Sequence, residues 1–230
     1  MLGKQVRCIL AAVATIMFAC LTPANAEDAA ATAQKLVKEA EETFKTFTAD
    51  PNMTWFRDHV QNAKGILIVP SLAKAGFVFG GSGGSGVYLQ QDPKTKAWSS
   101  PAFYTLGSVS WGLQAGVEVA EVVLMAMTEK GANAMLSTEF KAGADASIAA
   151  GPVGAGAQAA TADILQFSRS KGVFGGLTLE GSVIAVRDEL NNAYYGKSVQ
   201  PVDILVKRSV SSADASPLIR TISQQVAGTD

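Results

Sequence analysis

The fold class is decided by the stretch Val109-Ser110-Trp111-Gly112-Leu113-Gln114-Ala115-Gly116-Val117-Glu118-Val119. Every second residue of this stretch is apolar, and the residues between them are small or polar. Successive side chains of a β-strand point to opposite faces, so a period of two predicts a strand with one buried face and one solvated face. The chain is therefore expected to build a β-sheet around this segment.

Shorter strand patterns lie on both sides of this stretch. Residues 66–69 form an apolar run closed by Pro70, and residues 143–150 alternate again. Runs of this kind, bounded by turn residues, predict strands. The predicted strands are 66–69, 76–79, 87–90, 109–119, 143–150, 164–167 and 173–186.

Helical periodicity is strongest near the two ends of the chain. Residues 28–47 repeat apolar side chains at steps of three and four, which predicts an amphipathic helix. Asn52 or Thr54 is expected to cap a short second helix that contains Phe56. Further helices are predicted at 128–136 and 213–226, a helical turn is predicted at 188–195, and residues 201–206 remain ambiguous.

These elements indicate an α+β fold. Six to eight antiparallel strands lie between helices at the N- and C-terminal ends, and no regular alternation of strand and helix suggests a parallel sheet. Glycine inside a strand usually marks a bulge, a bend or the close approach of another backbone. The sequence therefore predicts a curled, glycine-rich antiparallel sheet or partial barrel; the glycines inside the predicted strands are Gly112, Gly116, Gly175, Gly176 and Gly181.

The first 26 residues have the features of an export signal. A basic start with Lys4 and Arg7 precedes an uncharged apolar run, and Ala24-Asn25-Ala26 offers a small-residue cleavage site. We expect residues 1–26 to be cleaved, residues 27–230 to form a single domain, and the protein to be exported; the periplasm, the outer membrane and secretion into the medium are the alternatives for its location. Met17-Phe18-Ala19-Cys20 also resembles a lipobox with atypical first and second positions, so lipidation of Cys20 is the alternative.

Cysteine and charge content restrict the function further. Both cysteines, Cys8 and Cys20, lie within the predicted signal, so the exported domain has neither a disulfide nor a thiolate site. The whole chain has a net charge of −1, and removal of Lys4 and Arg7 makes the remainder more acidic. Bulk charge therefore argues against a nucleic-acid partner.

Motifs that could support catalysis or cofactor binding are weak in this sequence. The glycines of residues 81–86 match G-x-G-x-x-G, but a strand pattern follows where a dinucleotide site needs a helix, so a glycine-rich hairpin is predicted. His59 is the only histidine and is interpreted as structural. The carboxylates Asp145, Asp163, Glu118 and Glu180 are scattered. We predict no catalytic residue, no metal site and no cofactor.

The amphipathic segment 33–47 has two interpretations. A helix with Phe44 and Phe47 on one side and lysines on the other is typical of a membrane interface. Its glutamates temper that interpretation, because such helices are usually net basic. The alternative, which the residues favour, is that the apolar stripe packs on the sheet of the domain itself.

Several motifs, in order along the chain, resemble the SYLF domain family of lipid- and actin-associated proteins, which also has exported bacterial members. The similarity covers about residues 35–205. The motifs lie in residues 63–81, 101–116, 143–154 and 168–181, and include Gly76-Phe77-Val78-Phe79-Gly80-Gly81, Gly112-Leu113-Gln114-Ala115-Gly116 and Ser168-Arg169-Ser170-Lys171-Gly172.

The resemblance implies a phospholipid-binding module that is not an enzyme. Basic residues and the amphipathic helix would hold lipid headgroups, and an exported protein would meet envelope lipids rather than actin. The alternative is a structural or protein-interaction module without a lipid ligand. The candidate lipid-binding residues are Lys35, Lys38, Phe44, Lys45, Phe47, Lys64, Lys74, Arg169 and Lys171.

Overall fold

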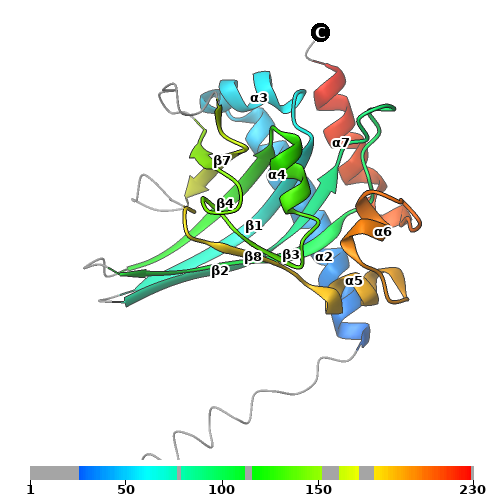
Figure 1. Cartoon of the computed structure of the whole chain (residues 1–230), viewed down its shortest axis with the longest axis horizontal. Coiled ribbons are helices and arrows are strands. Elements are labelled where there is room, and N and C mark those ends of the chain that lie inside the picture. Colours follow the sequence, from blue (N-terminus) through cyan, green and yellow to red (C-terminus); the bar gives the residue numbers. More distant parts are fainter. Residues whose placement is uncertain (1–25, 77–78, 112–115, 152–160, 171–178, 229–230) are drawn as a thin grey trace, which may run out of the picture.

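The computed structural model describes residues 26–76, 79–111, 116–151, 161–170 and 179–228. A strongly curled sheet is combined with helices from both ends of the chain, which pack together on one of its faces, as predicted for an α+β fold (Figure 1). The main helices are α2 (Ala26–Ala49), α3 (Thr54–Val60), α4 (Glu129–Ala134), α5 (Asp188–Tyr195), α6 (Pro201–Leu205) and α7 (Ser216–Ala227), with short 3-10 helices η1 (Pro51–Met53) and η3 (Ala213–Ala215). The strands are β1 (Gly65–Gly76), β2 (Phe79–Gln90), β3 (Ala102–Trp111), β4 (Gly116–Ala126), β5 (Glu139–Lys141), β6 (Ile148–Ala150), β7 (Ile164–Ser170) and β8 (Val183–Val186).

The strand order of the sheet is β5-β8-β3-β2-β1-β4-β7-β6. All neighbours are antiparallel except β6 and β7, which are parallel and depart from the all-antiparallel prediction. The β1–β2 hairpin occupies the centre, with β3 outside β2 and β4 outside β1. Consecutive strands β3 and β4 are therefore separated by the whole hairpin.

This topology shows that the single strand predicted at 109–119 is wrong. Trp111 ends β3 opposite Phe79, whereas Gly116 begins β4 opposite Gly76. Residues 112–115 lie outside the described residues. The period of two continued across two strands because alternation reports the face on which a side chain lies, and not the strand to which it belongs.

Three other strand predictions had the wrong bounds. Residues 76–79 belong to the end of β1 and the start of β2, and residues 77–78 are outside the described residues. In 143–150 only β6 is a strand, and Gly143 has a φ of +89°. In 173–186 only β8 is a strand, Gly181 has a φ of +81°, and residues 173–178 are not described. A positive φ at glycine stops the extended backbone, although the alternation of small residues continues.

The centre of the sheet is buried on both faces. Ile66 and Ile68 of β1 face a core with α2, α3 and α7, whereas Leu67 and Val69 face a second core with α6 and β5. A strand buried on both faces reads as a continuous apolar run, which explains residues 66–69. The predicted caps of the short helix were wrong, because Met53 is the residue before α3 and has no capping side chain.

Glycines in β2 fit against a bulge in β1. The register between the two strands shifts between Ile68 and Ser71. A Cβ atom at Gly84 would lie 2.5 Å from the carbonyl oxygen of Ser71, and one at Gly86 would lie 2.5 Å from that of Ile68. The glycine-rich segment is thus part of the β1–β2 hairpin, as predicted, and the close approach of the two backbones requires glycine there.

Candidate functional site

The apolar stripe of α2 packs on the domain itself. Phe44 and Phe47 have no exposed surface, and each lies 5.7 Å from the ring of Phe56 between centroids. Phe56 in turn meets Phe167 of β7 at 5.2 Å. The structure therefore supports the packing interpretation, and in this arrangement neither phenylalanine is accessible to a lipid.

The lysines of α2 lie on its solvent side. Lys35 pairs with Glu39 at 3.5 Å, and Lys45 pairs with Glu41 at 2.5 Å, while Lys38 is exposed. The helix carries three lysines against five acidic residues. Its outer surface is therefore net acidic, which does not favour anionic headgroups.

The remaining candidate cations are spread over the sheet. Lys64, just before β1, pairs with Glu129 at 2.8 Å, and Lys74 lies near the opposite end of that strand. Lys171 is outside the described residues. Those predicted lipid-binding residues that the structure describes are thus not brought together at one place.

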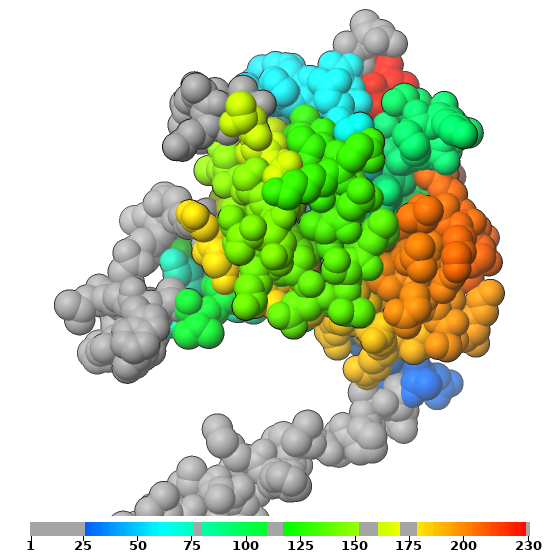
Figure 2. Space-filling view, in the orientation of Figure 1, coloured from blue at the N-terminus to red at the C-terminus, as the bar shows by residue number. Residues whose placement is uncertain are grey.

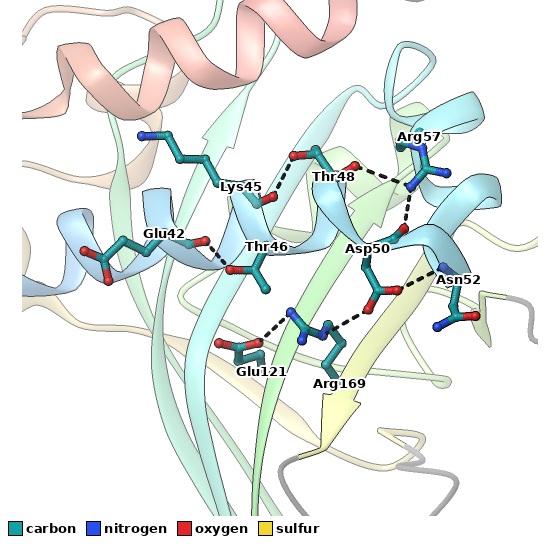
Figure 3. Close-up of polar contacts among 9 residues, drawn as sticks. All are labelled: Glu42, Lys45, Thr46, Thr48, Asp50, Asn52, Arg57, Glu121 and Arg169. Atoms are coloured by element: carbon teal, nitrogen blue, oxygen red, sulfur yellow. Dashed lines mark hydrogen bonds and ion pairs between the residues drawn. The ribbon is translucent and has the colours of Figure 1, made fainter.

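Arg169 joins the end of α2 to the sheet (Figure 3). Its Nε lies 3.3 Å from Oδ2 of Asp50, and a terminal nitrogen lies 3.6 Å from Oε2 of Glu121. Asp50 also accepts a hydrogen bond from the backbone N–H of Asn52, and Arg57 donates to the carbonyls of Asp50 at 2.5 Å and Thr48 at 3.3 Å. The side chain of Arg169 is 34% exposed, so this corner is structural but still open to solvent.

A surface that the sequence did not predict lies beyond the helices. The ends of β1 and β3 and the starts of β2 and β4 continue past the helix layer as an extension of the sheet (Figure 1). In Figure 2 these strand ends lie at the lower left, away from the orange and red C-terminal helices. We call this part the sheet extension. On one of its faces, neighbouring residues of the four strands form two rows across the sheet. The first row is Ala73, Gly83, Gly107 and Val119, and the second is Ala75, Gly81, Val109 and Val117.

This face of the sheet extension is apolar and exposed. It lies on the same side of the sheet as α2, but none of the described helices covers it. Val109 is 82% exposed, Val117 80% and Val119 38%. The sequence pattern placed these valines correctly on one face but predicted that the face would be buried. The alternation contains no information about which part of a sheet the helices reach.

The opposite face of the same strands is polar. The row between the two apolar rows consists of Ser108, Ser82, Lys74 and Glu118. The hydroxyls of Ser82 and Ser108 lie 2.7 Å apart, and Ser170 of β7 donates to the Glu118 carboxylate. Lys74 therefore belongs to a half-buried polar row, on the other side of the sheet from Arg169.

Two arginines lie at the margins of the apolar face. Arg169 and its partner Glu121 stand across from each other on β7 and β4, two residues from Val119. On the other margin Arg187 donates to the hydroxyl of Ser85 at 2.9 Å and lies 3.8 Å from Glu189. The side chain of Arg187 is 32% exposed. Guanidinium groups thus flank the exposed apolar rows on both sides.

The titratable groups considered for catalysis have structural surroundings. His59 stacks on Trp55 at 3.5 Å and shares a 2.9 Å hydrogen bond with the Trp55 carbonyl. Hydrogen bonds from the Thr128 hydroxyl, and from the backbone and hydroxyl of Ser147, lower the pKa of Asp163 to about 2, although desolvation acts in the opposite direction. Asp163 thereby ties α4 to the segment before β6. Within the described ranges, no group of three or more metal-ligating side chains converges.

Among the described residues, no helix combines the length and apolar character needed to cross a bilayer.

Comparison with known proteins provides a family context. A family model described as Ysc84, Las17-binding protein actin regulator, matches residues 107–225. The chain is 32% identical to Protein YSC84 of Saccharomyces cerevisiae over 201 residues, which covers 80% of this chain and 42% of the yeast protein. It is 33% identical to LAS seventeen-binding protein 3 of the same yeast over 175 residues, covering 72% and 37% of the two chains. It is 28% identical to SH3 domain-containing YSC84-like protein 1 of Homo sapiens over 202 residues, covering 85% and 58%.

These relatives are longer than the aligned region. The chain spans between about two fifths and three fifths of their lengths. No solved structure matches the chain.

Proposed function

This chain belongs to the Ysc84 family, and from that premise we propose that it is a non-enzymatic protein that binds phospholipid membranes in a bacterial envelope. Family membership confirms the SYLF resemblance, which implied a lipid-interacting domain. The envelope location rests on the export signal predicted in residues 1–26.

One observation carries the proposal. Arg169 and Arg187, each about one third exposed, lie on either side of an exposed apolar surface. Peripheral membrane proteins combine buried apolar area with cationic side chains that meet phosphate groups. Arginine suits this role because its planar guanidinium binds phosphate oxygens bidentately. Of the cations predicted earlier, Arg169 has the most favourable position, and Arg187 is added to it.

Vesicle co-sedimentation of the exported protein tests the proposal. We expect binding to vesicles of phosphatidylcholine, phosphatidylglycerol or their mixture, and weaker binding for Arg187→Gln. Arg220→Gln, an exposed arginine on α7, is the matched control. A combined Lys35→Gln and Lys38→Gln variant tests the predicted contribution of α2. Failure of the folded wild-type protein to bind vesicles of either lipid would refute the function.

A protein-interaction module is the second candidate. The observation that favours it is the burial of Phe44 and Phe47, which removes the predicted lipid face of α2. LAS seventeen-binding protein 3 is named for a protein partner, but the alignment covers only 37% of that relative. Chemical cross-linking in the native envelope, with mass spectrometry of the products, separates the two candidates: protein adducts without vesicle binding would favour this one.

A further inference from the structure

We propose that the sheet extension lies flat in the phospholipid interface, with its apolar face toward the acyl chains and its polar face toward water. This inference rests on the proposed function and assigns the surface that enters the lipid. It transfers membrane contact from helix α2 to the two apolar rows of the sheet.

The first argument is the different polarity of the two faces. The two apolar rows contain alanine, glycine and valine alone, whereas the row between them on the other face contains Lys74, Glu118 and two serines. Both faces belong to the same four strands, so their contrast follows from the period of two. A sheet that faced water on both sides would need no such contrast. An amphipathic layer at an interface requires it, as an interfacial helix does.

The second argument is the exposure of the apolar rows. Val109 and Val117 keep four fifths of their surface in contact with water. Other valines are less exposed, such as Val202 and Val206 on and after α6, at 37% and 49%. Contiguous exposed apolar surface on a soluble protein usually marks a binding site.

The third argument concerns the size and shape of the surface. The two apolar rows contain five side chains larger than hydrogen, Ala73, Ala75, Val109, Val117 and Val119. A stable protein interface uses about 20–30 residues on each side. The glycines between these side chains provide few projections or hollows for a complementary protein surface. Acyl chains adapt to such a surface, so lipid is a better occupant than a second copy of the chain.

The backbone sets a limit on depth. Among the described residues, β3 has a partner on its outer side only from Tyr104 to Gly107, and β4 only from Ala120 onward. Unpaired backbone groups are costly in hydrocarbon. The sheet extension therefore remains at the boundary between headgroups and acyl chains, where its strand edges reach water and phosphate.

The margins define the expected lipid dependence. Arg169 is paired with Asp50 and Glu121, and Arg187 lies near Glu189, so neither margin carries a large net charge. Apolar contact then supplies most of the affinity. Binding to phosphatidylcholine should persist at a salt concentration that screens exposed charges.

Two cysteine variants of the exported protein test the orientation. The exported domain, residues 27–230, contains no native cysteine, so a single cysteine at Val109 or Ser108 can carry an environment-sensitive fluorophore. These neighbours point to opposite faces of β3. On phosphatidylcholine vesicles we expect a blue shift and quenching by brominated acyl chains for the Val109 probe, and neither for the Ser108 probe.

The outcomes separate this inference from the proposed function. Vesicle binding with an aqueous spectrum at Val109, or with equal shifts at both positions, would overturn the orientation and leave the proposed function standing. No vesicle binding by the wild-type protein would overturn both. A Val109 shift that grows with protein concentration without lipid would assign the surface to a second copy and overturn the inference.

Substitution of the exposed valines supplies a second measurement. The pair Val109→Ser and Val117→Ser should weaken vesicle binding about tenfold while the unfolding midpoint stays unchanged. The pair Val202→Ser and Val206→Ser is the matched control and should have no effect on binding. Equal binding by all three proteins would contradict the inference.

Discussion

Replacing Phe44 by alanine is the most direct test of the role of helix α2. Phe44 is fully buried on the face of the sheet that α2, α3 and α7 cover, and its ring makes an edge contact with Phe56 at a centroid distance of 5.7 Å. If this packing is the function of the apolar stripe, Phe44→Ala must lower the free energy of unfolding. If the stripe instead contacts lipid, the substitution must lower membrane affinity and leave stability unchanged.

The expected magnitude follows from the burial. Truncation of a fully buried phenylalanine to alanine costs about 3–5 kcal/mol, which includes the cavity that remains. For a domain of about 200 residues, each kcal/mol corresponds to roughly 2–4 °C in Tm, so a shift of about 6–20 °C is expected. Lys38→Ala, on the exposed side of the same helix, should change the free energy of unfolding by less than about 0.5 kcal/mol.

Urea unfolding followed by far-UV circular dichroism measures both variants, and vesicle co-sedimentation is run in parallel. A loss of about 3–5 kcal/mol for Phe44→Ala, with vesicle binding retained below the transition, is the expected result. A loss below about 1 kcal/mol together with weaker vesicle binding would refute the reasoning, since a core residue cannot be removed at so small a cost.

Three further predictions concern the packing and the polar contacts. Tyr88→Phe should leave the urea midpoint unchanged or raise it, because the buried Tyr88 hydroxyl has no hydrogen-bond partner among the described residues. Tyr104→Phe removes a donor to the Met135 carbonyl and should lower the free energy of unfolding by about 1–2 kcal/mol. Gly86→Ala should lower the free energy of unfolding by about 1–3 kcal/mol, and with it Tm, because the added Cβ would lie 2.5 Å from the carbonyl oxygen of Ile68 in β1. Gly83→Ala is the control, because a Cβ there has no atom within 4 Å. Equal Tm values for the two variants would contradict this prediction. The pKa of Asp163 is about 2 in the folded protein against an ordinary 3.8, so its contribution to the free energy of unfolding is complete above about pH 4 and is lost as the pH falls toward 2. Asp163→Asn should therefore cost about 1–2 kcal/mol at pH 6. The free energies of unfolding of the two proteins, measured by urea titration, should converge near pH 2.

Local sequence patterns predicted much of the secondary structure. The step of three and four residues in 28–47 identified α2 and its buried stripe, and residues 188–195 coincide with α5. These elements were predictable because residues three and four positions apart lie on the same face of a helix, so the spacing of the apolar residues identifies both the helix and its buried face. The glycine-rich pattern likewise predicted a curled sheet, although not which glycines lie against the bulge in β1.

The candidate site was less predictable. Arg169 was identified from a motif, but its partners Asp50 and Glu121 are 119 and 48 positions away in the sequence, and only the fold brings them together. Arg187 was missed because no local pattern distinguishes it. Phe44 and Phe47 were correctly placed on one helix face, but the sequence left open whether a sheet or a lipid lies against it.

The opening stretch shows where sequence information ends. By itself, the sequence determined that Val109, Val117 and Val119 share one face, because side-chain direction in a strand depends on the local backbone alone. Only the tertiary structure decided that they belong to two strands on either side of the β1–β2 hairpin, and that no helix in the described part of the chain covers them. Strand order and helix cover depend on contacts between distant segments, and these are not encoded in the period of any one of them.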